Sequence, residues 1–379
     1  MIIIFAGSIG RLPVGGHAWI DMQYLSGLKA LGHDVYYFED CGDESWVYNW
    51  DIEELTTELS YPADYVRDCL EPLGFKNRWI YRAGNQSEGM SIESFREICA
   101  QADLMIVRAV PLTIWRDEYL EVHRRCYIDA DPGFNQISLI NGNAKLAETL
   151  NQCERLFTIG QRIGAADCPI PDAGYNWLKT VAPVSLPDWR VAENEDASHF
   201  TSVMQWRGFH DVVYKGLAYG QKDKEFPRFL KLPQLVSQPF RLALTGSSPE
   251  NFTEYGWEVV PGWVASKTTG SYQSFIQESR AEFGVAKHGY VAMRGGWFSD
   301  RSVCYLASGR PVLVEDTGLR DWLPVGEGIV TFSDISEAVR GVESINAEYE
   351  RHCHAAREIA EQYFAASLVL PLLIEEAMN

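Results

Sequence analysis

The chain has few cationic side chains for its 379 residues, with 33 Lys and Arg against 52 Asp and Glu and a net charge of −19. This imbalance argues against nucleic acid or an anionic membrane as the main partner, because both repel an acidic surface. A run of about 18 apolar residues, as a transmembrane helix needs, is also missing. The opening MIIIFAG is too short for a signal sequence and has no basic residue before it. We therefore expect a cytoplasmic protein.

Cysteine pairs of the kind that hold metals are missing as well. The eight cysteines are scattered singly, and no Cys-x-x-Cys spacing occurs. A structural zinc site needs clustered thiolate or imidazole ligands, and disulfide frameworks belong mainly to small secreted domains. We therefore expect eight reduced thiols and no metal site.

What the chain does contain is an alternation of apolar strands and amphipathic helices. Its length exceeds that of one usual hydrophobic core, so two domains are expected. Residues 2–7 predict a buried strand, residues 19–31 a helix and residues 34–40 a second strand. This βαβ order predicts a parallel sheet. Further strands of this half are predicted at residues 103–110, 125–131 and 155–160.

Residues 168–199 interrupt the alternation, because they are rich in proline and charge. The pattern then restarts, and from residue 335 onward the chain is predicted to be mostly helical. Two α/β halves of similar size place a cleft between the carboxyl ends of their strands, where ligands bind in open parallel sheets. The strands of the second half are predicted at residues 199–206, 241–246, 255–260, 281–287, 311–316 and 328–332.

A histidine stands at a chemically useful place in the first half. His17 directly follows Gly15 and Gly16, on the loop between the first predicted strand and the helix, and would face the cleft. Imidazole suits general-base chemistry, because its pKa lies near neutral pH. The same position also fits a histidine that only packs within or stabilises the loop, so both interpretations stay open.

The second half carries a glycine-rich loop that leads into a helix. Residues 286–318 contain Gly295-Gly296, and a helix is predicted from Ser299 or Asp300 to Gly309. Free backbone N–H groups and the positive end of the helix dipole make such a start an anion site. Ser299 could add a hydroxyl donor, and cationic side chains surround the loop, which suggests a diphosphate ligand. Alternatively, the cations only meet neighbouring carboxylates. These cations are Lys287, Arg294 and Arg301.

Two motifs resemble the glycosyltransferases of the GT-B superfamily. They are GGH followed by a Leu-rich helix and LGHDVYYF, and GGWFSDRSVCYLASGRPVLV in the second half. The resemblance implies an α/β fold of two Rossmann-like domains that face each other across a cleft. It implies an acceptor domain at residues 1–190, a nucleotide-sugar domain at residues 195–355, and a helix at residues 356–379 that crosses back to the first domain.

The resemblance also implies roles for individual residues. His17 matches the general base of inverting members, which is often paired with an aspartate; Asp103, Asp129 and Asp131 are the alternatives for that partner. Gly296, Trp297 and Ser299 match the diphosphate turn, and Arg294 stands where many inverting members have histidine. Lys222 resembles the lysine that retaining members place on the phosphates. The remaining expected donor contacts are Gly16, Lys287, His288, Arg301, Asp316 and Thr317.

The chain departs from the family pattern at two points. Ser302 stands where a glutamate usually holds the donor ribose, and no Glu-x7-Glu pair of the retaining subset occurs, since Tyr290 follows Glu282 at that spacing. Asp129-Ala130-Asp131 matches the metal-binding Asp-x-Asp motif in letters but lies in the acceptor half. We therefore expect metal-independent, inverting transfer from a UDP- or TDP-sugar to the hydroxyl of an acceptor, more plausibly a small molecule than nucleic acid.

Several alternatives remain open at this stage. One is a retaining transferase of the same fold. Another is a nucleotide-sugar epimerase, to which Asp129 and Asp131 could supply carboxylates. A DNA-modifying sugar transferase would need a basic stripe along the N-terminal cleft. A binding module for sugar nucleotides without catalytic activity is the fourth.

Overall fold

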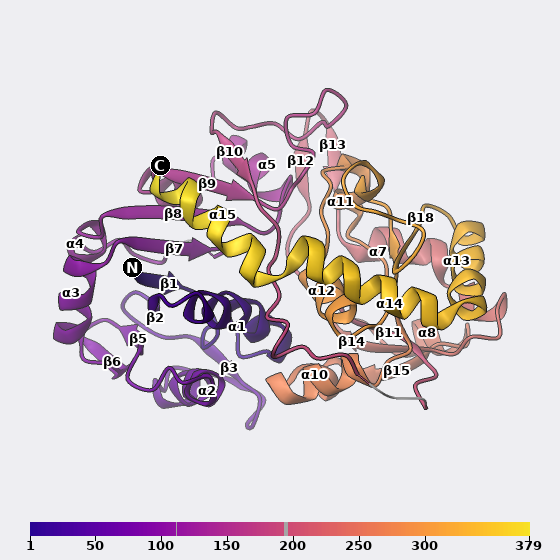
Figure 1. The fold of residues 1–379 in the computed structure, drawn as a ribbon, viewed down its shortest axis with the longest axis horizontal. Coiled ribbons are helices and arrows are strands. Elements are labelled where there is room, and N and C mark those ends of the chain that lie inside the picture. Colours follow the sequence, from indigo (N-terminus) through magenta and orange to yellow (C-terminus); the bar gives the residue numbers. More distant parts are fainter. Residues whose placement is uncertain (111, 193–195) are drawn as a thin grey trace.

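The chain folds around two separate β-sheets, one in each half (Figure 1). The computed structural model describes residues 1–110, 112–192 and 196–379. The domain start expected at residue 195 therefore lies outside the described residues. The two sheets lie beside each other with helices packed on their faces, and we call the two halves the N-terminal and C-terminal domains.

The N-terminal domain is built on an eight-stranded sheet of order β10-β9-β8-β7-β1-β2-β5-β6, parallel except for β6. Its strands are β1 (Ile2–Ala6), β2 (Asp34–Asp40), β5 (Trp79–Ala83), β6 (Gln86–Gly89), β7 (Leu104–Arg108), β8 (Arg124–Asp129), β9 (Arg155–Thr158) and β10 (Trp177–Lys179). Its helices are α1 (Gly15–Ala30), α2 (Ser60–Leu70), α3 (Ile92–Gln101), α4 (Asp117–Leu120), α5 (Phe134–Ile140) and α6 (Ala144–Asn151). A short hairpin, β3 (Val47–Asn49) and β4 (Glu54–Thr56), stands apart from the sheet.

The first βαβ unit shows why this half folds as predicted. β1 lies between β2 and β7, and its residues Ile3, Ile4 and Phe5 have no exposed surface. A strand buried on both faces needs this continuous apolar run. Gly32 follows α1 with φ +84°, a left-handed conformation that ends the helix and leads into β2.

The C-terminal domain has a six-stranded parallel sheet of order β15-β14-β11-β16-β17-β18. Its strands are β11 (Phe200–Gln205), β14 (Phe240–Thr245), β15 (Glu258–Pro261), β16 (Ala281–Gly284), β17 (Val312–Glu315) and β18 (Ile329–Phe332). Its helices before the C-terminal segment are α7 (Lys222–Glu225), α8 (Glu250–Thr253), α9 (Gly262–Ser266), α10 (Thr269–Gln277), α11 (His288–Met293), α12 (Asp300–Ala307) and α13 (Ile335–Ala347). A small hairpin, β12 (Val212–Tyr214) and β13 (Leu217–Tyr219), pairs by itself.

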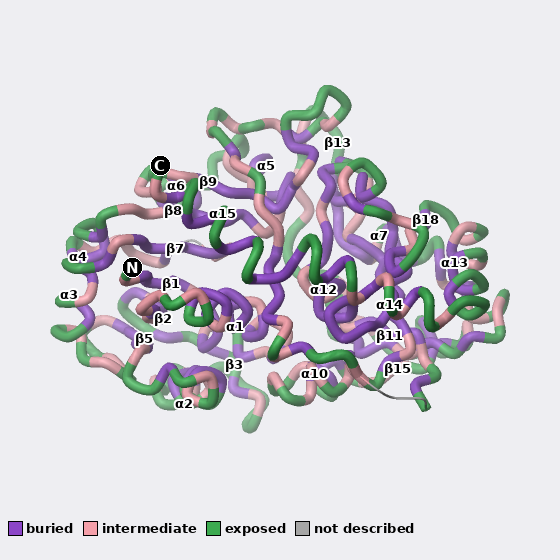
Figure 2. Tube along the Cα trace, in the orientation of Figure 1, coloured by how far each residue is buried: buried purple, intermediate pink, exposed green. Residues whose placement is uncertain are grey.

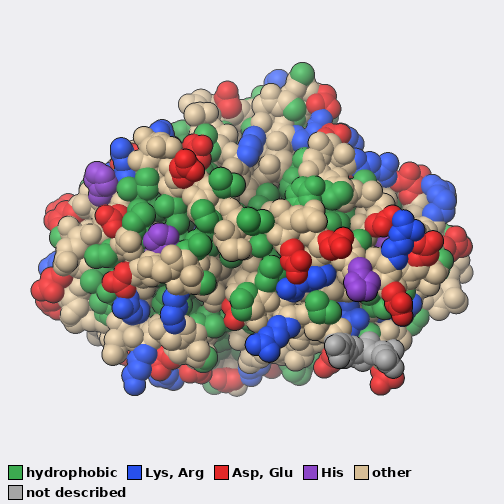
Figure 3. All heavy atoms as spheres, viewed as in Figure 1, with side chains coloured by type: hydrophobic (Ala, Val, Ile, Leu, Met, Phe, Trp, Pro, Cys, Tyr) green, Lys and Arg blue, Asp and Glu red, His purple; other side chains and the backbone are tan. Residues whose placement is uncertain are grey.

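The last two helices, α14 (Tyr349–Ile359) and α15 (Ala366–Met378), run from the C-terminal domain back to the N-terminal one (Figure 1). α15 packs on α1, where Gly27 leaves room for Leu370 and Ala366. Figure 2 shows the central strands of both sheets buried and the outer helices exposed on one side. In the face drawn in Figure 3, acidic and basic side chains are interspersed. Among the described residues, no helix combines the length and apolarity needed to cross a membrane.

Candidate functional site

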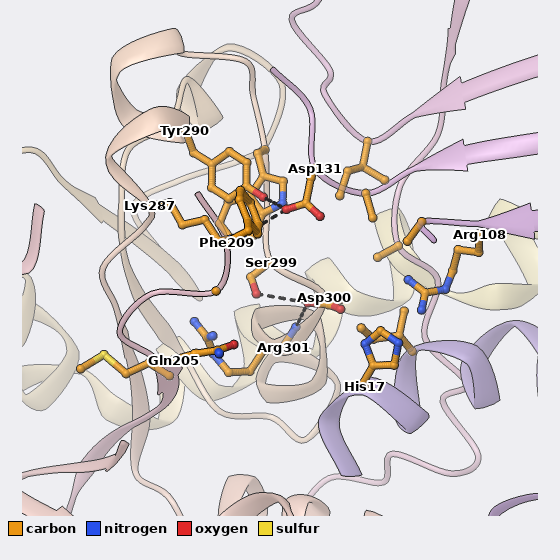
Figure 4. A pocket seen from close by; sticks show the side chains of 18 of the residues that line it. His17, Arg108, Asp131, Gln205, Phe209, Lys287, Tyr290, Ser299, Asp300 and Arg301 are labelled. Carbon is orange, nitrogen blue, oxygen red and sulfur yellow. Dashed lines mark hydrogen bonds and ion pairs between the residues drawn. The ribbon is translucent and has the colours of Figure 1, made fainter. Parts of the chain in front are cut away.

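A cavity of about 360 Å³ lies between the two sheets, at the carboxyl ends of their central strands (Figure 4). The N-terminal domain contributes the start of α1 and the ends of β7 and β8, and the C-terminal domain contributes the end of β11 and the starts of α7, α11 and α12. Seven of the residues predicted for the site line it. They are His17, Asp131, Lys222, Lys287, Trp297, Ser299 and Arg301.

His17 lies in the first turn of α1, with its Nε2 atom 2.6 Å from the hydroxyl oxygen of Ser8. Burial, and next the charge of Arg108, lower the pKa of His17 to about 4. The imidazole is therefore neutral at neutral pH. A neutral ring can accept a proton, although a pKa this low makes it a weak base in the empty cavity.

The glycines before His17 allow the two domains to approach closely. A Cβ atom on Gly15 would lie 2.5 Å from the carbonyl carbon of Thr268, and one on Gly16 would lie 2.6 Å from Cε2 of Tyr272. Thr268 caps α10 of the C-terminal domain, and Trp19 of α1 donates from Nε1 to the carbonyl of Thr269 at 2.8 Å. Gly16 was expected at the donor; it lies at the domain contact instead, because only glycine fits there.

The predicted partners of His17 are engaged elsewhere. Asp129 is fully buried, and its carboxylate accepts hydrogen bonds from Asn135, Gln136 and Thr158, which fix the loop after β8. Asp129 does not line the cavity, which corrects its expected place beside His17. Asp103 accepts from the backbone N–H of Ile2 at 2.8 Å, at the opposite end of the sheet.

Asp21, on α1, is linked to His17 through Ser8, which contacts both residues. Asp21 accepts from Arg108 Nε at 2.5 Å and from the backbone N–H of Ser8 at 2.9 Å. Asp21 has no exposed surface, and the guanidinium of Arg108 balances its negative charge. Asp21 raises the pKa of His17 somewhat, but less than burial and Arg108 lower it. No aspartate therefore forms the expected ion pair with His17 in the described part of the chain.

Asp131 does face the cavity, where it links the two domains. Its carboxylate accepts from Lys287 Nζ at 3.1 Å and from the hydroxyl of Tyr290 (Figure 4). Burial raises the pKa of Asp131, but Lys287 and Tyr290 outweigh it and hold the pKa below its ordinary value. The Lys287 ammonium also lies 3.8 Å from the ring centroid of Phe209. Asp131 is thus ionised and its charge is balanced from across the cavity.

Three further cationic or polar groups from the C-terminal domain converge on the cavity. Arg301 is positioned by Glu282, whose Oε1 accepts from its Nε at 2.7 Å. Burial, together with the charges of Arg301 and Lys287, lowers the pKa of Lys222 to about 7. Ser299 precedes α12 and donates to Asp300 at 3.3 Å. A helix start with adjacent cations favours an anionic ligand.

Arg294 and Gly296 lie outside the cavity and shape the turn before α12. Arg294 ends α11 with φ +47°, and its guanidinium approaches Asp321 at 3.8 Å. Gly296, with φ +74°, packs against Arg162 and donates to the carbonyl of Thr317. Arg294 was expected on the diphosphate; the left-handed turn directs it to the outer surface of the loop.

The remaining expected donor contacts form hydrogen bonds within the protein. His288 accepts from the backbone N–H of Gly220 at 3.2 Å. Asp316 accepts from the backbone N–H groups of Gly318 and Leu319, and Thr317 donates to the carbonyl of Trp297. These three residues do not line the cavity; they hold the loops whose other side chains do.

Several residues of the cavity wall were not predicted from the sequence, and those with charged or aromatic side chains include Arg108, Phe209, Tyr290 and Asp300. Arg108 is the clearest case, since it is a charged residue at the end of the apolar strand LMIVR with only 3% of its surface exposed. An arginine that directly ends an apolar strand can be recognised from the sequence, and such a position lies at the ligand-binding edge of a parallel sheet. Tyr290 stacks on Trp297 with ring centroids 4.1 Å apart, and sequence spacing could not reveal that pair.

Residues 228–368 match the glycosyl transferase-like family. This segment covers much of the C-terminal domain, including the turn before α12, and extends into α15. No curated protein matches the chain in sequence.

Several solved structures resemble the whole chain. An alpha-glucosyltransferase in complex with UDP-glucose and DNA containing an abasic site superposes with a TM-score of 0.60 at 10% identity, covering 100% of this chain and 99% of that one. HepE from Anabaena, in complex with UDP and glucose, gives 0.58 at 10% identity, with 99% and 98% covered. Sucrose-phosphate synthase from Thermosynechococcus elongatus gives 0.50 at 12% identity, again with 99% and 98% covered.

These likenesses confirm the predicted GT-B fold of two Rossmann-like domains. The match of residues 228–368 bears out the resemblance seen in the second motif and supports a transferase enzyme.

Proposed function

We propose that the protein is a glycosyltransferase that moves a sugar from a nucleotide-diphosphate sugar to an acceptor hydroxyl. The observation that carries this proposal is the convergence, in one cavity between two Rossmann-like domains, of His17 from one side with Lys222, Ser299 and Arg301 from the other. A proton acceptor thus faces a cluster of phosphate-binding groups across a space that a sugar can occupy. The C-terminal domain would hold the donor and the N-terminal domain the acceptor.

The donor diphosphate would bind at the start of α12. The hydroxyl of Ser299, the backbone N–H groups of the helix and the cations Lys222, Lys287 and Arg301 can stabilise the charge that develops on the leaving group. These groups require no metal ion for that step. UDP is the proposed nucleotide, with TDP as the alternative, because the similar alpha-glucosyltransferase and HepE structures contain UDP or UDP-glucose.

His17 would act as the base on the acceptor hydroxyl. In the tautomer in which its Nε2–H donates to Ser8, the Nδ1 lone pair is available to take the proton. The acceptor oxygen then attacks the anomeric carbon, the bond to the diphosphate breaks, and the sugar inverts its configuration. Transfer is expected to show a requirement for His17 in kcat, not only in acceptor binding.

Retention of configuration is a second candidate, and one observation favours it. The pKa of His17, lowered to about 4 by burial and Arg108, leaves a weak base in the empty cavity. A retaining transferase could instead use a phosphate oxygen of the departing diphosphate to take the acceptor proton. NMR of the anomeric configuration of the product distinguishes the two courses.

A small acceptor fits the charge of the molecule better than DNA does. Acidic residues outnumber basic ones in residues 1–190, and charges of both signs are interspersed over the face in Figure 3. DNA binding depends on contiguous cationic surface, so this distribution weakens the DNA-modifying alternative. DNA as an acceptor is a property of the similar alpha-glucosyltransferase and is not carried over.

The test combines donor binding and product analysis. We expect UDP and UDP-glucose to raise the melting temperature, and Ser299→Ala and Lys222→Met to reduce that shift. Arg294→Ala is the matched control, because Arg294 lies near the same loop but outside the cavity. Loss of the shift in Arg294→Ala alone, or no shift with any nucleoside diphosphate, would refute the donor site. His17→Gln should then bind UDP normally and lose transfer.

A further inference from the structure

The guanidinium of Arg108 combines deep burial with unused hydrogen-bonding capacity. Its side chain is only 3% exposed and stands at the end of β7, a central strand of the N-terminal sheet. Nε is held by Asp21 at 2.5 Å, whereas Nη2 is buried and has no hydrogen-bond partner within the described part of the chain. A buried donor without a partner destabilises the folded state, so its presence calls for an explanation.

The orientation of the free edge indicates what could supply the partner. Asp21 occupies Nε, which leaves the buried Nη2 without a partner among the described residues. Arg108 lines the cavity, and Figure 4 shows its guanidinium extending toward His17. Two Nη groups side by side match the two oxygens of a carboxylate or a phosphate.

We infer that Arg108 binds an oxyanion of the acceptor, a carboxylate or phosphate, and thereby places the acceptor hydroxyl beside His17. This inference rests on the proposed transfer reaction and specifies its acceptor class: a small anionic molecule. The donor diphosphate is assigned to the other wall of the cavity, at Ser299 and Arg301, so Arg108 is left for the second substrate.

The charges around Arg108 are compatible with this ligand. Asp21 is satisfied by Arg108 itself and by the backbone N–H of Ser8. Asp300, on α12, and Asp131, after β8, are further negative groups that interact with Arg108. Oδ1 of Asp300 accepts from Ser299 and from the backbone N–H of Arg301, and Asp131 accepts from Lys287 and Tyr290. Arg11 adds positive charge on the N-terminal side, since it too lowers the pKa of His17.

Binding an oxyanion here would also change His17. The charge of Arg108 is the second cause, after burial, of the low pKa of His17. An anion on Arg108 offsets that charge, so the pKa of His17 rises when the acceptor is bound. Binding of the acceptor would thus make His17 a stronger base, and the low pKa would apply only to the site without acceptor.

The experiment uses the intact protein with UDP-glucose and matched acceptor pairs: glucose 6-phosphate against glucose for phosphate, and galacturonate against galactose for carboxylate. Binding in the presence of UDP is measured by calorimetry and transfer by release of UDP. We expect the anionic member of at least one pair to bind about 10- to 100-fold more tightly, as a charge-assisted bidentate contact allows. The pair that responds identifies phosphate or carboxylate as the recognised group.

Variants separate this role from a structural one. Arg108→Lys keeps the charge beside Asp21 but lacks the paired Nη groups, and we expect it to lose the anionic preference while binding UDP normally. Arg108→Gln should do the same if it folds, and Arg96→Gln, on an exposed part of α3, should change nothing. The inference is overturned if Arg108→Lys keeps the preference, or if UDP binds and none of the anions does. Failure of UDP itself to bind would instead overturn the proposed function.

Discussion

Gly15→Ala tests whether the glycine pair before His17 sets the distance between the domains. The added Cβ would lie 2.5 Å from the carbonyl carbon of Thr268, where ordinary contacts begin at 3.4 Å. One domain must therefore move by about 1 Å relative to the other. Forcing a methyl group into a packed contact typically costs about 1–3 kcal/mol, and alanine recovers about 0.4–1 kcal/mol by restricting the unfolded chain.

The effect on transfer should be larger than the effect on stability. His17 lies two residues from Gly15, so the displacement moves the proposed base relative to the donor groups on α12. A misplacement of about 1 Å can reduce rates about 100-fold. We expect kcat/KM for transfer from UDP-glucose to fall by about that factor, with only a few degrees lost in Tm.

The control is another glycine of the same contact region. A Cβ on Gly270, in the first turn of α10, would meet only Thr268 Oγ1, at 3.9 Å. Gly270→Ala should therefore keep full activity and equal or higher stability. The reasoning is refuted if Gly15→Ala keeps wild-type kcat/KM, or if both alanine variants lose activity equally.

Three further predictions follow from the site and the helix contacts. A bound diphosphate requires protonated Lys222, and burial and neighbouring cations lower the pKa of this residue to about 7. The affinity for UDP should therefore fall above pH 7 by up to about tenfold per pH unit. Lys222→Met should abolish this pH dependence in calorimetric titrations. Asp131→Asn frees Lys287 from its carboxylate partner and should strengthen UDP binding several-fold at low ionic strength; unchanged binding would contradict this competition. Gly27→Val would press on Leu370, since even a Cβ at this position lies 2.5 Å from Cδ1 of Leu370. It should lower the free energy of unfolding, measured by urea denaturation, by about 1–3 kcal/mol.

Through Lys222, a rise in pH should increase the stability of the fold while it weakens UDP binding. Its folded pKa of about 7 lies below the ordinary 10.5, so the unfolded chain binds more protons between these values. The contribution of Lys222 to the free energy of unfolding therefore rises with pH across that window. Comparing wild type with Lys222→Met by denaturation at pH 7 and pH 9 measures this contribution.

The sequence was most informative where one local pattern decides the structure. β1 and β2 were predicted because strands buried on both faces need continuous apolar runs, and the start of α12 because glycine, serine and a helical pattern follow in order. The strand predicted at residues 255–260 instead spans Glu258–Pro261, since Trp257 packs in the core before the strand begins. Strands such as β9 and β10 are short, and β10 at an edge carried no clear signal.

Side-chain direction was the part that the sequence could not supply. Asp129 and Asp131 are two residues apart, yet one is locked under α5 and the other faces the cavity. Arg294 and Arg301 flank the same glycine-rich loop in sequence. Arg301 lines the cavity, whereas Arg294, in a left-handed backbone conformation, does not. Such differences depend on contacts from distant segments, which no local pattern records.

The return of the C-terminal helices has a mechanical consequence. The chain passes between the domains twice, near Val184 and near Ala365, and the two passages are joined by a β-bridge with hydrogen bonds from Val184 to Phe364 and from Ala366 to Val184. Domains joined by one strand can twist in any direction, whereas two strands tied to each other form a hinge with a preferred axis. Any opening and closing of the cavity would then follow one path, so that His17 returns to the same position relative to Ser299 and Arg301.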